Sequence, residues 1–174
     1  MYLYGILMSD NIVESIKSNI DYILDLIPEI KYSIGFDQKH PHHHLDVWEH
    51  TLYALSLSEK DFEIRLALLL HDIGKPFSYQ DGEVRHFKGH EKVSSNMARI
   101  ILKRLEYKEE FIDKICKYIE LHDIPIKEED ILSNPKMYSK IYKIQCCDAL
   151  AHHPEKLEKR KEYLEKTKKL FKKI

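Results

Sequence analysis

A short apolar run that ends in two polar residues constrains this chain more than any other feature. Residues 66–70 are five consecutive apolar residues, so we expect this segment to be buried on all sides. His71 and Asp72 follow directly, although a buried helix rarely carries such side chains. Gly74 predicts a left-handed helix end, and Pro76 should prevent the helix from resuming. An unpaired buried carboxylate is very costly, and a metal ion would satisfy both polar side chains.

The composition favours an all-α protein. The 174 residues fit one domain, and 43% hydrophobic residues are enough for a core. Only five Gly and six Pro occur, and few segments alternate polar and apolar residues with a period of two. We therefore expect a single domain over residues 1–174, with an N-terminal helix at 10–27, a motif-bearing core at about 46–152 and a basic C-terminal helix at 155–174.

Charge and cysteine content narrow the function classes. A net charge of −1 and a pI of about 6.8 give no overall nucleic-acid footprint. No apolar run approaches the roughly 18 residues of a membrane span, so no membrane partner is expected. Residues 1–7 lack the basic leader of a signal peptide. The three cysteines form no spaced framework, which favours reduced thiols and a cytoplasmic location.

Three further helices are expected to carry a polar residue on their apolar side. Asp46 is a predicted N-cap of a helix whose inward face includes His50. His122 falls at the inward-facing end of a second helix, and Asp148 lies on the apolar stripe of a third. Taken alone, a histidine such as His50 is more often an ordinary core residue than a ligand. Several such residues together need a common explanation, and a shared metal site is the simplest.

The ligand types limit the identity of the metal. Imidazole and carboxylate groups suit a divalent transition metal (Mn, Fe, Co, Ni or Zn) and do not separate these ions. The absence of a cysteine cluster argues against a closed structural zinc site.

Two segments leave more than one interpretation open. Residues 29–45 are irregular and include four histidines, at positions 40 and 42–44, which fit either a surface loop or a loop over the mouth of a site. Residues 155–174 contain nine Lys or Arg and four Glu, with an apolar residue every seven positions. That pattern fits a solvated helix packed on the core by a thin stripe, or a tail that contacts a partner or RNA.

The order of His50, the His71-Asp72 pair and Asp148 resembles the HD superfamily of metal-dependent phosphohydrolases. Closer still, residues 71–76 (His-Asp-Ile-Gly-Lys-Pro) and 86–90 (His-Phe-Lys-Gly-His) are similar to the HD domain of bacterial CCA-adding tRNA nucleotidyltransferases. The resemblance implies an HD-domain bundle of about six to eight helices around a buried metal site. No acidic nucleotidyltransferase motif accompanies it, so we expect the HD module to stand alone.

The resemblance also implies a role for each matching residue. The ligands of a first metal ion would be His50, His71, Asp72 and Asp148. Asp72 would bridge to a second ion, which His90 and His122 would bind. His86 would complete that second site or contact the substrate, and Lys75 would face the substrate phosphate. One or two divalent ions per chain are therefore expected.

The activity implied is hydrolysis of a phosphomonoester or phosphodiester by metal-activated water, with a nucleotide or an RNA 3′ end as substrate. Asp123 stands where some relatives carry a second histidine, so the second ion should be the weaker one. Cys146 and Cys147 flank Asp148 but fit core thiols, so no covalent intermediate is expected. The competing classes are a non-catalytic metal- or nucleotide-binding module and an RNA-binding accessory protein. The sequence leaves the oligomeric state open.

Overall fold

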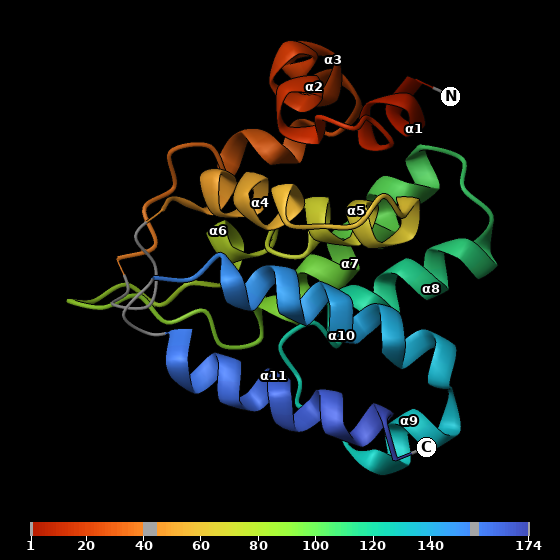
Figure 1. Ribbon diagram of the computed structural model, residues 1–174. Coiled ribbons are helices and arrows are strands. Elements are labelled where there is room, and N and C mark those ends of the chain that lie inside the picture. Colours follow the sequence, from red (N-terminus) through yellow and green to blue (C-terminus); the bar gives the residue numbers. More distant parts are fainter. Residues whose placement is uncertain (1, 40–44, 154–156, 174) are drawn as a thin grey trace.

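The computed structural model describes residues 2–39, 45–153 and 157–173, and within them the fold is all-α, as predicted (Figure 1). The four histidines at positions 40 and 42–44 lie outside the described residues. The elements are α1 (Tyr2–Leu7), α2 (Ile12–Ser18), α3 (Ile20–Leu26), the 3-10 helix η1 (Pro28–Tyr32), α4 (Val47–Ser56), α5 (Phe62–Leu70), α6 (Lys75–Ser78), α7 (His90–Arg104), α8 (Glu109–Glu120), α9 (Glu128–Ser133), α10 (Pro135–Leu150) and α11 (Leu157–Phe171).

Helix α5 is the centre of the fold. It contacts α1, α4, α7, α8 and α10, and all seven residues from Ile64 to Leu70 are buried. Burying a leucine side chain contributes about 1.5–3 kcal/mol. Burial of this apolar run therefore contributes much of the free energy that packs the other helices around α5. The Asp61 side chain accepts a hydrogen bond from the Ile64 amide and caps the start of the helix.

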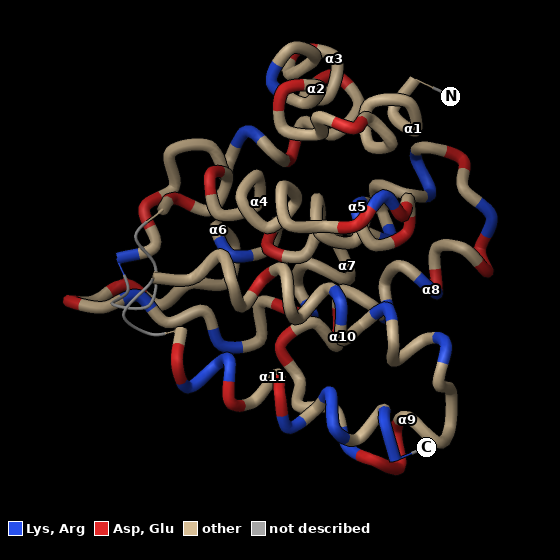
Figure 2. Tube along the Cα trace, in the orientation of Figure 1, with Lys and Arg blue, Asp and Glu red and all other residues tan. Residues whose placement is uncertain are grey.

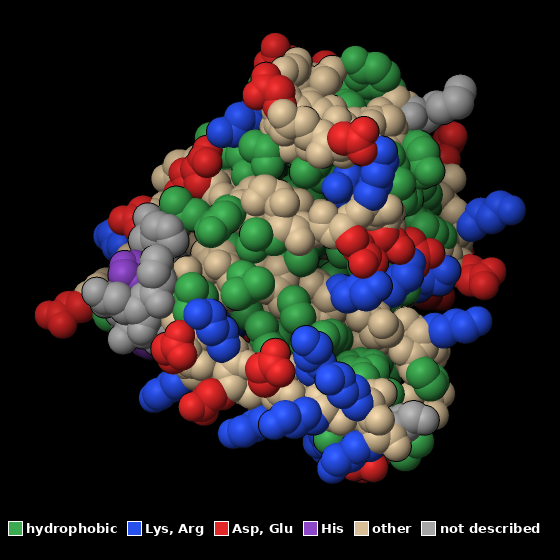
Figure 3. Space-filling model, viewed as in Figure 1, with side chains coloured by type: hydrophobic (Ala, Val, Ile, Leu, Met, Phe, Trp, Pro, Cys, Tyr) green, Lys and Arg blue, Asp and Glu red, His purple; other side chains and the backbone are tan. Residues whose placement is uncertain are grey.

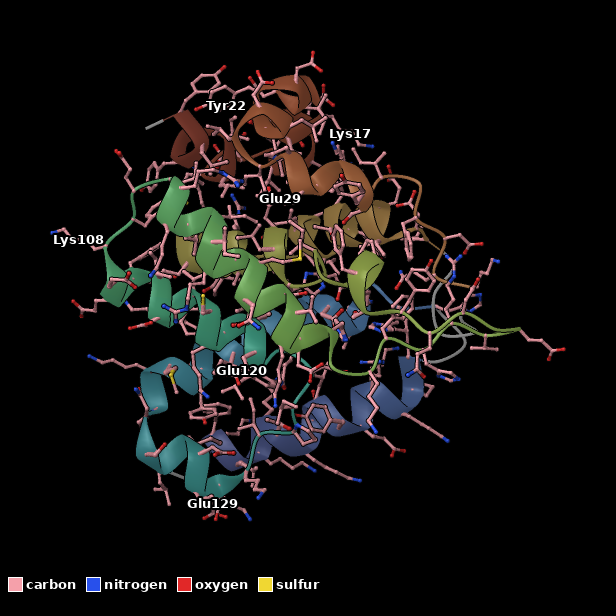
Figure 4. The ribbon with its side chains drawn as sticks, turned by 180° about the vertical axis from the view of Figure 1, so that it is seen from behind. Lys17, Tyr22, Glu29, Lys108, Glu120 and Glu129 are labelled. Atoms are coloured by element: carbon pink, nitrogen blue, oxygen red, sulfur yellow. The ribbon has the colours of Figure 1, made fainter. Side chains whose placement is uncertain are left out.

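The other helices form layers around α5. Figure 1 shows α4, α5 and α10 side by side in the middle of the molecule, with α1–α3 on one side and α11 along α10 on the other. Seen from behind, α7 and α8 cover the opposite face, and the labelled Lys108 and Glu120 mark the two ends of α8 (Figure 4). The ends of α4, α5, α7, α8 and α10 can therefore supply side chains to one central site.

The N-terminal segment differs from the single helix predicted at 10–27. The chain breaks at Asn19 into α2 and α3. The Asn19 side chain donates to the Ser15 carbonyl, at 2.7 Å, and accepts from the Tyr2 hydroxyl, also at 2.7 Å. Asparagine competes in this way with the helical backbone. Helix α1, which was not predicted, packs against α2.

The turn after α5 is also built differently from the prediction. Gly74 is not left-handed: its φ is −83°, and Pro76 lies in the first turn of a new helix, α6. The glycine is required by packing, because a Cβ there would lie 2.5 Å from the Ser94 amide nitrogen of α7. The Gly74 amide donates to the Ser94 hydroxyl at 2.9 Å. This close approach holds the end of α5 against α7.

The remaining elements follow the predictions more closely. Asp46 caps α4 by accepting a hydrogen bond from the Glu49 amide. The described residues form more helices than the about six to eight expected, because the short helices α1, α6 and α9 lie in segments for which no helix was predicted. Acidic and basic residues alternate along α11 (Figure 2). Within the described parts of the chain, the helices are too short or too polar to cross a bilayer.

Candidate metal centre

Four predicted ligands meet where α4, α5 and α10 come together. We call His50, His71, Asp72 and Asp148 the four-ligand group, and all four are buried. The Nε2 atom of His50 lies 2.9 Å from Asp148 Oδ1 and 3.6 Å from Asp72 Oδ2. The Nε2 atom of His71 lies 3.3 Å from Asp72 Oδ2 and 3.6 Å from Asp148 Oδ1. One small volume therefore receives two imidazole nitrogens and two carboxylate oxygens.

A second set of ligand atoms lies on the other side of Asp72. We call Asp72, His90 and His122 the three-ligand group. The Oδ1 atom of Asp72 lies 3.1 Å from His90 Nε2 and 3.8 Å from His122 Nε2. The two oxygens of Asp72 thus face different groups, Oδ2 toward His50 and His71 and Oδ1 toward the other two histidines. This is the arrangement that a bridging carboxylate needs.

Backbone hydrogen bonds fix the orientation of each histidine. The Nδ1 atoms of His71, His90 and His122 lie 2.7, 2.9 and 2.6 Å from the carbonyl oxygens of Leu68, Phe87 and Ile119, each three residues earlier. A carbonyl can only accept, so each Nδ1 carries a proton, and whenever the ring is neutral its Nε2 directs a lone pair into the centre. Metal-binding histidines are typically held in this way.

Gly89 and the turn before it place His90. Gly89 has a φ of +82°, a left-handed conformation that glycine adopts without strain. The chain therefore reverses just before α7, and His90 becomes the first residue of that helix.

The unpartnered atoms of the centre fit a metal. Among the residues that the structure describes, three buried side-chain atoms lack a hydrogen-bond partner: His71 Nε2 and both oxygens of Asp72. The Nε2 atoms of His90 and His122 are 3.2 Å apart, so two lone pairs would face each other between neutral rings. A cation between these atoms would remove that repulsion and satisfy the unpaired ones. The oxygen and nitrogen donors suit a divalent transition metal.

The charges of the centre also favour a cation. Burial alone would lower the pKa of His71, but the negative charges of Asp72 and Asp148 outweigh it and raise that pKa to about 10. Burial would raise the pKa of Asp72, yet His71 and Lys75 hold it well below its usual range. Burial, with the charges of His71 and His90, lowers the pKa of His122 to about 3. In the metal-free protein, a proton on His71 takes the place of a metal ion.

Lys75 lies closer to the ligands than predicted. Its ammonium is 2.7 Å from Asp72 Oδ2, without hydrogen-bond geometry, and donates to Gln38 Oε1 at 2.9 Å. The side chain is buried, and it also lines a cavity of about 530 Å³ next to the centre. Lys75 therefore compensates the charge of the carboxylate as well as facing the space where a substrate would bind.

His86 lies outside both ligand groups. It is exposed, and it lines the same cavity as Lys88 and His90. Its backbone pairs with that of Gln80 in an isolated antiparallel bridge. His86 is therefore not among the candidate metal ligands in the described residues. Asp123 also lines the cavity, at the position where some relatives are expected to carry a second histidine.

Sequence reasoning missed two residues at the centre. His152 is buried, and its Nδ1 lies 2.8 Å from the Asp148 carbonyl. Its position four residues after Asp148, on the same helical face, was an available signal. Gln38 orients Lys75 from an irregular segment, where no periodicity could indicate its direction.

Comparison with known proteins agrees with this arrangement. A model of the HD domain matches residues 42–170, and the chain belongs to this family. A CC-adding tRNA nucleotidyltransferase of Thermus thermophilus is 35% identical over 111 residues, which are 59% of this chain and 25% of that protein. An A-adding tRNA nucleotidyltransferase of Deinococcus radiodurans is 32% identical over 117 residues, 62% of this chain and 27% of that protein. The chain thus spans about a quarter of the length of these relatives. HD domains bind divalent metals, and the His/Asp groups are the residues that could hold them.

Proposed function

We propose that this chain is a metal-dependent phosphohydrolase that cleaves a phosphomonoester or phosphodiester of a nucleotide or an RNA end. One observation carries the proposal: Asp72 presents its two oxygens, neither with a hydrogen-bond partner among the described residues, to two separate groups of histidines. Membership of the HD family supports it, as does the cavity of about 530 Å³, which is within the size range of small-molecule sites.

In this proposal, different residues hold the metal ions, balance charge and contact the substrate. When bound, divalent metal ions lower the pKa of a water molecule and neutralise charge on the phosphoryl group. Asp72, Asp148 and the histidines of the two groups would hold these ions, and the Nδ1 hydrogen bonds keep the rings of His71 and His122 in place. Lys75 balances the charge of Asp72 and contributes a cation to the cavity wall. His86 and Lys88 lie on the cavity wall, where they contact the phosphoester.

The cysteines do not serve as nucleophiles in this proposal. Burial raises the pKa of Cys146, and burial together with the neighbouring negative charges raises that of Cys147 to about 12. Both thiols therefore stay protonated at neutral pH and are poor nucleophiles.

The test is a screen of phosphoesters with each metal in turn. Protein loaded with Mn, Fe, Co, Ni or Zn is incubated with nucleotides that carry 2′, 3′, 5′ or cyclic phosphates and with an RNA 3′-phosphate. We expect hydrolysis of at least one nucleotide and complete loss of activity in chelator. If no phosphoester is cleaved although metal is bound, the chain is a non-catalytic binding module instead.

A further inference from the structure

A smaller cavity beneath α11 adjoins the metal centre. Its volume is about 240 Å³, and it shares His122, Asp123, Asp148 and Arg160 with the larger cavity. Whole ligand sites commonly have volumes of about 300–1,000 Å³. The smaller cavity therefore fits one part of a ligand whose other part lies beside the metal ligands. We call it the α11 cavity.

The uncharged polar side chains in the wall of the α11 cavity, Gln145 and Tyr163, are already hydrogen-bonded. The Gln145 amide donates to the carbonyl oxygens of Leu121 and Ile124, at 3.0 and 2.7 Å, and accepts from the Tyr163 hydroxyl at 2.9 Å. That hydroxyl also accepts from the Ile126 amide at 3.1 Å. The wall thus offers mainly apolar surface, from the Tyr163 ring, Pro125 and Ala149. A ring system suits such a surface better than a strongly hydrated group.

Arg160 stands where the two cavities join. The other four arginines donate to carbonyl, carboxylate or hydroxyl oxygens. For Arg160, no ion pair or hydrogen bond is found over residues 2–39, 45–153 and 157–173. Burial lowers the pKa of His152, and the positive charge of Arg160 adds to this effect. Burial and the charge of Asp148 raise the pKa of Asp123, and Arg160 opposes that rise, so Arg160 lies close enough to act on both groups. An available guanidinium beside a cavity is well suited to a phosphate.

Helix α11 holds this arginine in place. Leu164 is buried against the body of the molecule, and its carbonyl accepts from the Tyr142 hydroxyl of α10 at 3.1 Å. Thr167 is also buried. The charged side chains of both signs seen over α10 and α11 in Figure 3 lie on the outer face. The segment considered as a tail is therefore a wall of the site.

We propose that the α11 cavity holds the nucleoside part of the substrate and that Arg160 contacts its phosphate at the junction. The inference rests on the proposed function, because it places the scissile phosphoester beside the metal ligands. Apolar and aromatic surface next to a cation is the combination that recognises a base and its phosphate.

The experiment uses a nucleoside and inorganic phosphate, the two products of phosphomonoester hydrolysis, which cannot be hydrolysed further. Calorimetry measures binding of the four common ribonucleosides and of inorganic phosphate to the full chain loaded with Mn²⁺. The variants are Ala149→Leu, which fills the α11 cavity, and Arg160→Gln, with Lys161→Gln as a control on the exposed side of α11. We expect at least one nucleoside to bind. Ala149→Leu should weaken that binding at least tenfold and leave phosphate affinity unchanged.

The second variant separates the two parts of the proposal. Arg160→Gln should weaken phosphate binding by about tenfold, the effect of losing one charge-assisted hydrogen bond, while Lys161→Gln changes neither affinity. If Ala149→Leu does not fold, a wild-type crystal soaked with the nucleoside still tests whether the nucleoside occupies the α11 cavity. The Arg160→Gln variant still tests the contact with phosphate. The inference is overturned if no nucleoside binds, if it binds elsewhere, or if both variants behave as wild type. Nucleoside binding without hydrolysis contradicts only the proposed function, and hydrolysis without nucleoside binding contradicts only this inference.

Discussion

The four-ligand group and the three-ligand group share Asp72 but differ in their access to the cavity. His50 and His71 have no exposed surface, and neither lines the cavity of about 530 Å³. His90 and His122 both line it. Asp72 and Asp148 also line the cavity, so the two groups differ in their histidines and in their number of ligands. We expect that an ion held by the three-ligand group would keep more positions open for water and substrate than an ion held by the four-ligand group.

The largest effect should come from the shared residue. Asp72→Ala removes a ligand from both groups and leaves His71 without its closest carboxylate. We expect metal content to fall to near zero and turnover to fall by more than the roughly 10²–10³-fold cost of losing one transition-state contact. Elemental analysis and a kinetic assay measure both. Asp113→Ala, which removes a surface ion pair with Arg99, should be neutral. Normal metal content in Asp72→Ala would contradict the bridging role.

Substitutions on either side of Asp72 should separate the groups. We expect His71→Ala to lose the tightly held ion and His90→Ala to lose only the weaker one, each with a fall in turnover of about 10²-fold. Metal content per chain, measured after dialysis, distinguishes the two cases. If His90→Ala loses both ions, the two groups are one site.

Removal of the Lys75 side chain should lower the stability of the metal-free protein more than that of the metal-bound protein. Breaking a buried ion pair by deleting one partner costs about 3–5 kcal/mol, because the two carboxylates Asp72 and Asp148 then share only the positive charge of His71. A metal ion on Asp72 would replace the positive charge of Lys75. We therefore expect Lys75→Ala to lower the melting temperature strongly without metal and weakly with it, to retain its metal and to have reduced turnover. Equal destabilisation in both forms, or loss of the metal, would show that Lys75 has another role.

Metal binding should stabilise the protein and depend on pH. An ion that binds only the folded state contributes about 2.7 kcal/mol at a concentration of 100 Kd, so the melting temperature should rise with metal concentration. Without metal, His71 is protonated below its pKa of about 10, and it must lose this proton to bind an ion. Affinity should therefore fall by up to about tenfold for each unit that the pH drops below 10. A pH-independent affinity would mean that His71 is not a ligand.

Alkylation of the thiols should have the smallest effect. Burial raises the pKa of all three cysteines, and none belongs to either ligand group. We expect treatment of folded protein with iodoacetamide at pH 7 to leave turnover nearly unchanged. Rapid inactivation that substrate prevents would indicate a nucleophilic thiol.

The sequence indicated the residues of the candidate metal centre more clearly than their surroundings. His50, His71 and Asp148 stand out because helical periodicity places a polar group on an apolar face. The packing of Gly74 on Ser94 and the pairing of Lys75 with Gln38 link residues 20 and 37 positions apart, so no local pattern contains them. The break at Asn19 was missed because the apolar stripe continues through it, and only the side-chain hydrogen bonds reveal it.

The most direct test of the proposed dinuclear centre is anomalous scattering from a crystal grown with Mn²⁺. We expect one strong peak among His50, His71, Asp72 and Asp148, and a second, weaker peak between Asp72 Oδ1 and the Nε2 atoms of His90 and His122. The carboxylate of Asp72 should lie between the two peaks, with one oxygen directed at each. Absence of both peaks, with Lys75 still 2.7 Å from Asp72 Oδ2 as in the metal-free arrangement, would contradict the account.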